Sequence, residues 1–244
     1  MNTTAHGPRD SSGGERGANT ARDPYRHFAW LYDRVLDPWL RPLHFAVLER
    51  CRREGAKRVI DLCCGTGAQC RRLHRAGLDV TGVDISAAMV AQARLKSPAD
   101  LPIVHGDAAH TPFGSGQFDA AVIQLALHEK SAAAREALLL EAVRLVRAQG
   151  IVCICDFLGR PPASSRGTHW ARSFVERLAG REHFVCYQEY LNQGALPGVL
   201  TGLGCSARLE ARFHRGATGM SVVRVQAMDL GTRIHEAEKS DAVS

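Results

Sequence analysis

From Arg58 onward, short apolar runs alternate with helical stretches, and this alternation constrains the chain more than any other feature of its sequence. Strand-sized runs that alternate with amphipathic helices are typical of parallel βαβ units. The run Ile151–Phe157 is almost continuously apolar, as expected of a parallel strand buried on both faces. We expect parallel strands at residues 58–63, 79–83, 102–104, 118–125 and 151–157.

The pattern changes beyond Leu158, where helices, a turn and a final pair of strands are expected. The two last strand-like runs face each other across a glycine-containing turn and predict an antiparallel hairpin. The fold class is therefore α/β, a doubly wound sheet of seven strands that is mostly parallel and ends in that hairpin. The expected elements are helices at residues 168–178 and 182–192, a turn at 196–199, and strands at 207–214 and 220–227.

Serine and glycine mark the expected helix boundaries. Ser86 and Ser131 precede helical stretches and suit the N-cap position. Gly77 and Gly150 follow helical stretches and suit the C-terminal end, where a left-handed backbone is common. The helix before Gly150 is expected to span Ala132–Arg147.

Composition excludes several classes of protein. With 45% hydrophobic and 23% charged residues the chain is an ordinary globular one. No apolar run approaches the roughly 18 residues that cross a bilayer. The net charge of +6 comes mostly from arginines spread along the chain, which favours solvated faces over a nucleic-acid partner. The eight cysteines include no CxxC pair, so we expect free thiols and no metal site.

Val59–Gly67 carries the most chemical information. A glycine-rich turn between a strand and a helix lets a ligand approach the backbone, and Asp84, at the end of the next strand, suits a ribose diol. Asp61 argues against a dinucleotide, because a carboxylate there would repel a pyrophosphate. Cys70 also stands where a G-x-G-x-x-G motif has its third glycine.

These residues resemble the class I S-adenosylmethionine-dependent methyltransferases, a Rossmann-like family, and within it the ubiquinone and menaquinone biosynthesis C-methyltransferases. The resemblance covers residues 25–157. The matching pieces are Val59–Gly67, Gly82–Met89, Gly106–Ala108, the strand from Phe118 to His128, and Leu145–Gly150.

The resemblance implies S-adenosylmethionine as cofactor. Gly65 and Gly67 would pass close to its methionine part, with Asp61 near the ammonium. Asp84 would bind the ribose hydroxyls, Ile85 would pack on the adenine, and Asp107 would accept from the adenine amino group, unless Asp107 only forms a turn. Gln124 and Leu125 would lie beside the sulfonium. Tyr32 belongs to an aromatic segment that resembles the family's lid, unless Phe28, Trp30 and Tyr32 simply pack a helix on the domain. The remaining cofactor-site residues that the resemblance implies are Cys63, Met89 and Ala108.

The acceptor is expected to be a small molecule methylated at carbon or oxygen, because no Asn- or Asp-Pro-Pro-aromatic run of the amine methyltransferases is present. His128 is the candidate general base, with a capping or surface histidine as the alternative. Further candidates are Asp156 and, in the segment after Leu158, His169, His183, Tyr187 and Tyr190. An RNA or protein methyltransferase, or a non-catalytic cofactor-binding protein, remains the alternative function.

The expected organisation is one domain over residues 24–228, with a helical cap at 24–55 and a substrate-side insertion at 158–204. Residues 1–23 lack a signal sequence and predict a disordered segment of a cytoplasmic protein, and residues 229–244 predict a flexible tail. The arginine-rich stretch Trp39–Arg53 is compatible with peripheral contact with an anionic membrane, but it favours a solvated helix face.

Overall fold

The computed structural model describes residues 29–159 and 184–226, and for residues 29–35 the backbone alone. Its centre is a seven-stranded sheet with the order β3-β2-β1-β4-β5-β7-β6. Strands β1 to β5 run parallel, and β7 pairs antiparallel with both β5 and β6, so the predicted α/β fold is confirmed. The strands are β1 Arg58–Leu62, β2 Asp79–Asp84, β3 Ile103–His105, β4 Phe118–Gln124, β5 Val146–Phe157, β6 Ala207–Phe213 and β7 Thr218–Arg224.

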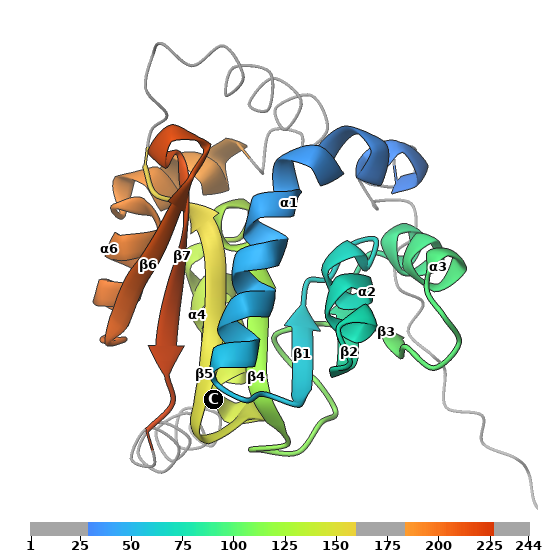
Figure 1. The fold of residues 1–244 in the computed structure, drawn as a ribbon. Helices are drawn as coiled ribbons and strands as arrows, with labels where there is room; N and C mark the ends of the chain where they lie inside the picture. The colour runs from blue at the N-terminus through green and yellow to red at the C-terminus, as the bar shows by residue number, and fades with distance from the viewer. Residues whose placement is uncertain (1–28, 160–183, 227–244) are drawn as a thin grey trace, which may run out of the picture.

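Helices cover both faces of the sheet (Figure 1). On one face α1, α2 and α3 bury Leu43, Leu73 and Val90 in one apolar cluster. On the other face α4 and α6 bury Leu138 and Leu196 in a second cluster. The bounds are α1 Ala29–Arg53, α2 Ala68–Arg75, α3 Ala87–Lys96, α4 Ala132–Leu145 and α6 Ala195–Gly202, with short 3-10 turns η2 Leu127–Glu129 and η3 His214–Gly216. Residues 184–192 are also helical.

The predicted helix boundaries hold at three places. The Ser86 and Ser131 hydroxyls accept hydrogen bonds from the backbone N–H groups of Met89 and Ala134, which satisfies donors in the first turns of α3 and α4. Gly77 follows α2 with a φ of 86° and donates its N–H to the carbonyl of His74. These local signals act through the nearest few residues, which explains why the sequence alone locates them.

Two predicted boundaries are wrong. Gly150 does not end a helix: α4 stops at Leu145, and β5 already begins at Val146, which pairs with Phe118 before a register shift. Long-range sheet pairing overrides the local glycine signal there. The predicted turn at residues 196–199 lies inside α6. Pro197 is tolerated because it occupies the first turn of that helix, where a backbone N–H has no intrahelical partner.

Helix α1 is fixed to the far end of the sheet. The Trp39 ring stacks on the His214 ring with centroids 4.0 Å apart, and His214 Nε2 hydrogen-bonds to the Trp39 carbonyl at 2.9 Å. This contact joins α1 to η3, between β6 and β7.

Within the described residues no helix is long and apolar enough to span a membrane. The predicted segments 1–23, 168–178 and 229–244 lie outside those residues.

Candidate active site

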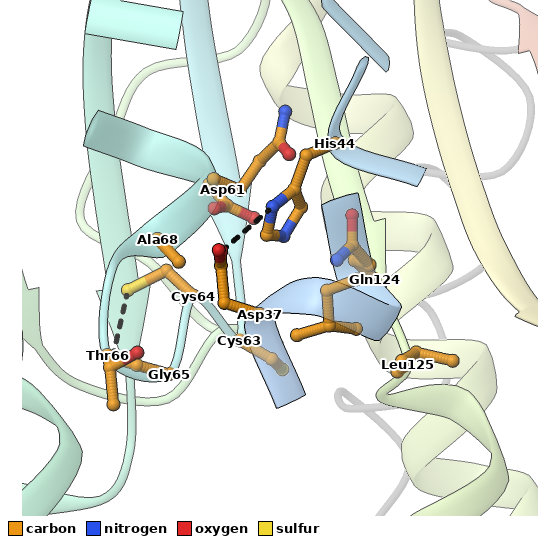
Figure 2. Close-up of a pocket in the computed structure, with 12 residues that line it drawn as sticks. Asp37, His44, Asp61, Cys63, Cys64, Gly65, Thr66, Ala68, Gln124 and Leu125 are labelled. Atoms are coloured by element: carbon orange, nitrogen blue, oxygen red, sulfur yellow. Dashed lines mark hydrogen bonds and ion pairs between the residues drawn. The ribbon is translucent and has the colours of Figure 1, made fainter. Parts of the chain in front are cut away.

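A pocket opens between the carboxyl ends of β1 and β4. The strand order reverses at these two strands, because β2 and β3 continue to one side and β5 to the other. Open α/β sheets bind ligands at such a switch point. The pocket holds roughly 500 Å³ of empty space, including open solvent. Its walls are Asp37, Leu40, His44, Asp61, Cys63, Cys64, Gly65, Thr66, Ala68, Gln69, Gln124 and Leu125 (Figure 2).

The turn after β1 forms the floor of this pocket. Gly65 and Gly67 have φ angles of 55° and 74°, in the left-handed region that favours glycine. A Cβ at Gly65 would meet no atom within 4 Å, so this position faces open space. A Cβ at Gly67 would lie 3.2 Å from that of Ala93, so Gly67 lets α2 pack against α3. The two glycines thus have different tasks, which the motif alone does not separate.

Asp61 sits at the end of β1 with 2% of its surface exposed. Its Oδ2 accepts a hydrogen bond from the Cys70 thiol at 3.1 Å. Burial raises the pKa of this carboxyl from 3.8 to about 7; the Cys70 bond opposes the rise and the nearby Asp84 adds to it. Among the described residues no lysine or arginine lines the pocket, so Asp61 suits a ligand that brings its own positive charge.

Asp84, at the end of β2, braces the glycine turn. Its Oδ2 accepts from the Gly65 N–H at 2.7 Å and its Oδ1 from the Ser86 N–H at 2.9 Å. Burial nevertheless raises the pKa of this carboxyl. Each carboxylate oxygen retains a second lone pair, so Asp84 keeps the capacity to accept from a hydroxyl.

The residues expected around an adenine differ in exposure. Ile85 is 65% exposed, whereas Met89 and Ala108 are buried. Asp107 Oδ1 accepts a hydrogen bond from the Ala109 N–H at 2.9 Å. This is the kind of contact that a turn-forming aspartate makes. Burial opposes ionisation of Asp107, but this bond and the contact with His110 lower its pKa overall. None of these four residues lines the pocket beside Asp61.

Two glutamines in the pocket have unsatisfied amide groups. Gln69, on the first turn of α2, is 4% exposed, and neither its Oε1 nor its Nε2 has a hydrogen-bond partner among the described residues. The buried Oε1 of Gln124, the last residue of β4, also has no hydrogen-bond partner among the described residues. Buried polar groups almost always have partners, so these atoms indicate where a polar ligand binds.

Sequence reasoning expected a helical cap over residues 24–55 and Tyr32 in the cofactor site, but it missed Gln69 and the residues of α1 that line the pocket. Asp37, Leu40 and His44 reach the pocket from α1. Figure 2 shows the His44 ring between the side chains of Asp61 and Gln124. No motif precedes β1 to mark these positions, because α1 reaches the site only through its packing on the sheet. Of the predicted cofactor residues, Asp61, Cys63, Gly65, Gln124 and Leu125 line the pocket; the side chain of Tyr32 lies outside the described part.

His128, on η2 directly after β4, and Asp156, near the end of β5, form a buried pair. His128 is 3% exposed, which rules out the surface alternative. Its Nδ1 lies 2.8 Å from Asp156 Oδ1, and Asp156 Oδ2 accepts from the Leu127 N–H at 2.9 Å. Burial works against protonation of His128, but the Asp156 charge and hydrogen bond raise its pKa overall. Nδ1 faces the Asp156 carboxylate, and Nε2 lies 3.7 Å from Glu129 Oε1, beyond an ordinary hydrogen bond.

Aromatic rings surround this pair. The Phe157 and Tyr187 ring centroids lie 4.8 and 5.9 Å from that of His128, both edge to face. Tyr190 is fully buried and donates its hydroxyl to the Phe157 carbonyl at 2.8 Å. Trp39 of α1 packs on Phe157 at 6.4 Å. The predicted candidates Tyr187, Tyr190, His128 and Asp156 therefore come together, whereas His169 and His183 lie outside the described residues.

The cysteines near the pocket are free thiols. Burial raises the pKa of Cys63 to about 12, and the pKa of Cys70 is also raised, in the first place by its hydrogen bond with Cys64. Both groups therefore stay protonated near neutral pH, in the form that is a poor nucleophile and metal ligand. No cluster of three metal-binding side chains occurs within residues 29–159 and 184–226.

Comparison with known proteins bears on the same region. Residues 60–154 match the family described as a methyltransferase domain. Over 136 residues the chain is 38% identical to a demethylmenaquinone methyltransferase of Beutenbergia cavernae, covering 55% of each chain. A demethylmenaquinone methyltransferase of Corynebacterium kroppenstedtii is 33% identical over 112 residues, which are 46% of this chain and 47% of the relative. The chain thus matches about half the length of these relatives.

Solved structures share the fold more widely. An O-methyltransferase family protein from Burkholderia thailandensis has a TM-score of 0.62 at 16% identity, covering 85% of this chain and 61% of that one. Human N-acetylserotonin methyltransferase, solved with S-adenosylmethionine, has a TM-score of 0.59 at 16% identity, covering 83% of this chain and 59% of its own. At this identity the likeness describes the fold and no more.

Proposed function

The chain carries a class I S-adenosylmethionine-dependent methyltransferase domain, related to the menaquinone and ubiquinone branch of that family, and on this premise we propose that it transfers the methyl group of S-adenosylmethionine to a small molecule. One observation supports this most strongly. The buried carboxylate of Asp61 lies at the switch point of the sheet, in a pocket whose described lining contains no lysine or arginine. An ammonium group on the ligand would balance that charge, whereas a phosphate would not.

The residues present fit this cofactor. The unsatisfied amides of Gln69 and Gln124 offer hydrogen bonds to its amino acid part, and Gly65 leaves room for its approach. Asp84 would accept from the ribose hydroxyls. We assign the rest of the cofactor site as the resemblance implies: Tyr32, Cys63, Gly67, Ile85, Met89, Asp107, Ala108 and Leu125.

When bound, S-adenosylmethionine supplies an electrophilic methyl group, so the main task of the protein is to position the acceptor in line with it. Where the acceptor must lose a proton, we propose His128 as the general base. Asp156 is its positioning residue, because the bond at 2.8 Å fixes Nδ1 and turns Nε2, which lies 3.7 Å from Glu129 Oε1, to the side where it would take the proton. Such a base contributes about 10²- to 10⁴-fold to the rate.

The surroundings of His128 favour an aromatic acceptor. Phe157 and Tyr187 already contact the histidine ring edge to face, a geometry that a planar hydroxylated ring could share. Two relatives are named demethylmenaquinone methyltransferases, so a quinol is the first acceptor to try. Loss of the hydroxyl proton to His128 would activate either the ring carbon or the oxygen of such an acceptor.

A radiolabel assay tests the proposal. The full chain is incubated with S-adenosylmethionine carrying a tritiated methyl group and with a panel of quinols, catechols and phenols, next to RNA and a protein extract as alternative acceptors. Transfer to a small aromatic acceptor that falls by at least 100-fold in His128→Ala is expected. Transfer to RNA or protein alone, or no transfer to any acceptor, would overturn the proposal. Equal activity of His128→Ala would remove the histidine from the mechanism.

A further inference from the structure

Arg135 is a buried cation in an unfavourable place. It lies in the first turn of α4, and 1% of its surface is exposed. Burial removes the hydration of the guanidinium, and the N-terminal end of a helix carries a partial positive charge that repels a cation. Such a group is stable only where hydrogen bonds and opposite charges surround it. The contacts of the guanidinium must therefore account for a charge at this position.

The guanidinium joins two segments that are distant in the sequence. Toward η2, its Nη1 donates to the carbonyl of Lys130 at 2.7 Å. Toward the helix of residues 184–192, the same Nη1 reaches the carbonyl of Cys186 at 3.5 Å. Its Nη2 donates to Gln193 Oε1 at 3.1 Å and lies 3.4 Å from Glu189 Oε2. The rigid fork of an arginine serves both sides at once, which the single ammonium of a lysine cannot do.

Both segments carry groups of the aromatic cluster around His128. Lys130 follows His128 by two residues, and Cys186 directly precedes Tyr187. The Tyr187 ring packs edge to face on the histidine, with centroids 5.9 Å apart. By binding the two carbonyls, the guanidinium sets the spacing between His128 and Tyr187 from behind.

Tyr190 anchors the same helix at a second point. Its hydroxyl donates to the Phe157 carbonyl of β5 at 2.8 Å, and its ring lies 5.6 Å from the Arg135 Cζ. Two anchors fix the rotation of a helix as well as its place, so the direction in which Tyr187 points depends on both.

We propose that Arg135 is a positioning residue for the methyl acceptor: it holds the helix of residues 184–192 against η2, so that Tyr187 stands at a fixed distance from His128. This assignment rests on the proposed function, in which the acceptor binds beside His128. The partners of Arg135 named above are not among the described residues that line the pocket beside Asp61. Cutting the bridge should therefore affect the acceptor and leave the cofactor site as it is.

Two variants cut the bridge in different ways. Arg135→Lys keeps the charge but cannot span both segments, and Gln193→Leu removes one bond on the helix side alone. Arg144→Leu is the matched control, because Arg144 lies further along α4 and bonds to Glu141 of that helix. For each full-length chain we would measure kcat and KM for the best acceptor, the pH profile of kcat/KM, the calorimetric Kd for S-adenosylmethionine, and amide hydrogen exchange over residues 184–193.

Arg135→Lys and Gln193→Leu are expected to lower kcat/KM for the acceptor by roughly 10- to 100-fold, since a misplacement of about 1 Å can cost that much. The Kd for S-adenosylmethionine should change by less than about threefold. Amides of residues 184–193 should exchange faster, because the helix has lost an anchor. The acid limb of the pH profile should stay in place, because the bond between His128 and Asp156 is intact. Arg144→Leu should alter neither kcat/KM nor this exchange.

The contrary results are distinct. Unchanged kcat/KM in both variants, an equal loss in Arg144→Leu, or a parallel loss of cofactor affinity would overturn the positioning role and leave the proposed function intact. A shifted acid limb would also overturn it, because the substitution would then have disturbed His128 itself. If Arg135→Lys does not fold, Gln193→Leu decides the matter by the same measurements. Failure of the wild-type chain to methylate any acceptor would overturn the proposed function and this assignment with it.

Discussion

Replacing Asp61 by asparagine should stabilise the protein without ligand, and most strongly at neutral and alkaline pH. Burial raises the pKa of Asp61 from 3.8 to about 7. Between these values the folded protein holds a proton that the unfolded chain has released, so the free energy of unfolding falls as pH rises through this window. A shift of about three pKa units corresponds to roughly 4 kcal/mol of destabilisation above pH 7.

Asparagine has nearly the same shape and no charge, so it avoids this cost. We expect Asp61→Asn to be more stable than wild type by up to about 4 kcal/mol at pH 8, with a much smaller difference at pH 5. Urea denaturation at both pH values, followed by circular dichroism, measures the difference. A variant that is less stable at pH 8, or a difference that does not depend on pH, would refute the reasoning.

Asp119→Asn is the control of opposite sign. Although burial opposes ionisation, hydrogen bonds from the backbone N–H of Arg58 and from Arg147 lower the pKa of Asp119 to about 2. The stability it contributes is present above pH 4 and is lost as pH falls toward 2. Asp119→Asn should therefore be less stable than wild type at pH 8, by about 1 kcal/mol, because solvent screens the interactions of this partly exposed group.

Three further predictions follow from contacts in the same part of the molecule. Cofactor binding should release a proton from Asp61 below pH 7, seen as a dependence of the calorimetric heat on the ionisation enthalpy of the buffer; equal heats in all buffers would contradict it. Because the pKa of His128 is raised, the acid limb of kcat/KM should lie above pH 6.5 and move to lower pH in Asp156→Asn; an unmoved limb would exclude the positioning role. Arg135 is 1% exposed and donates a hydrogen bond to the Lys130 carbonyl at 2.7 Å. Arg135→Leu should lower the free energy of unfolding by about 3 kcal/mol, and a loss below about 1 kcal/mol in urea titration would contradict this.

The sequence predicts the sheet well because its signals are local. Apolar runs locate all seven strands, and serine and glycine locate caps at Ser86, Ser131 and Gly77. Asp61 is found because it belongs to the glycine-turn motif Val59–Gly67, whereas Gln124 comes only from the resemblance to the methyltransferase family; the sheet order places both at the switch point. The register of β5 is not local, since it depends on pairing with Phe118, and this explains the error at Gly150.

The missed part of the site is contributed by helices whose placement depends on tertiary packing. His44 reaches the pocket because Leu43 and Val47 dock α1 on the sheet and because Trp39 stacks on His214, nearly 180 residues away in the sequence. A pattern of charges along residues 39–53 cannot encode that docking. Gln69 could have been suspected, because it follows the glycine turn by two residues on the first turn of α2.

The most direct test of the central claim is a calorimetric titration of the full chain with S-adenosylmethionine at pH 8, with NAD as control and with Asp84→Ala for comparison. The account predicts binding in the micromolar range, no binding of NAD, and an affinity loss of about 1 to 3 kcal/mol in the variant, the usual cost of losing a hydrogen-bond acceptor. Binding of NAD in place of S-adenosylmethionine, or of neither, would contradict the assignment of this pocket to the methyl donor.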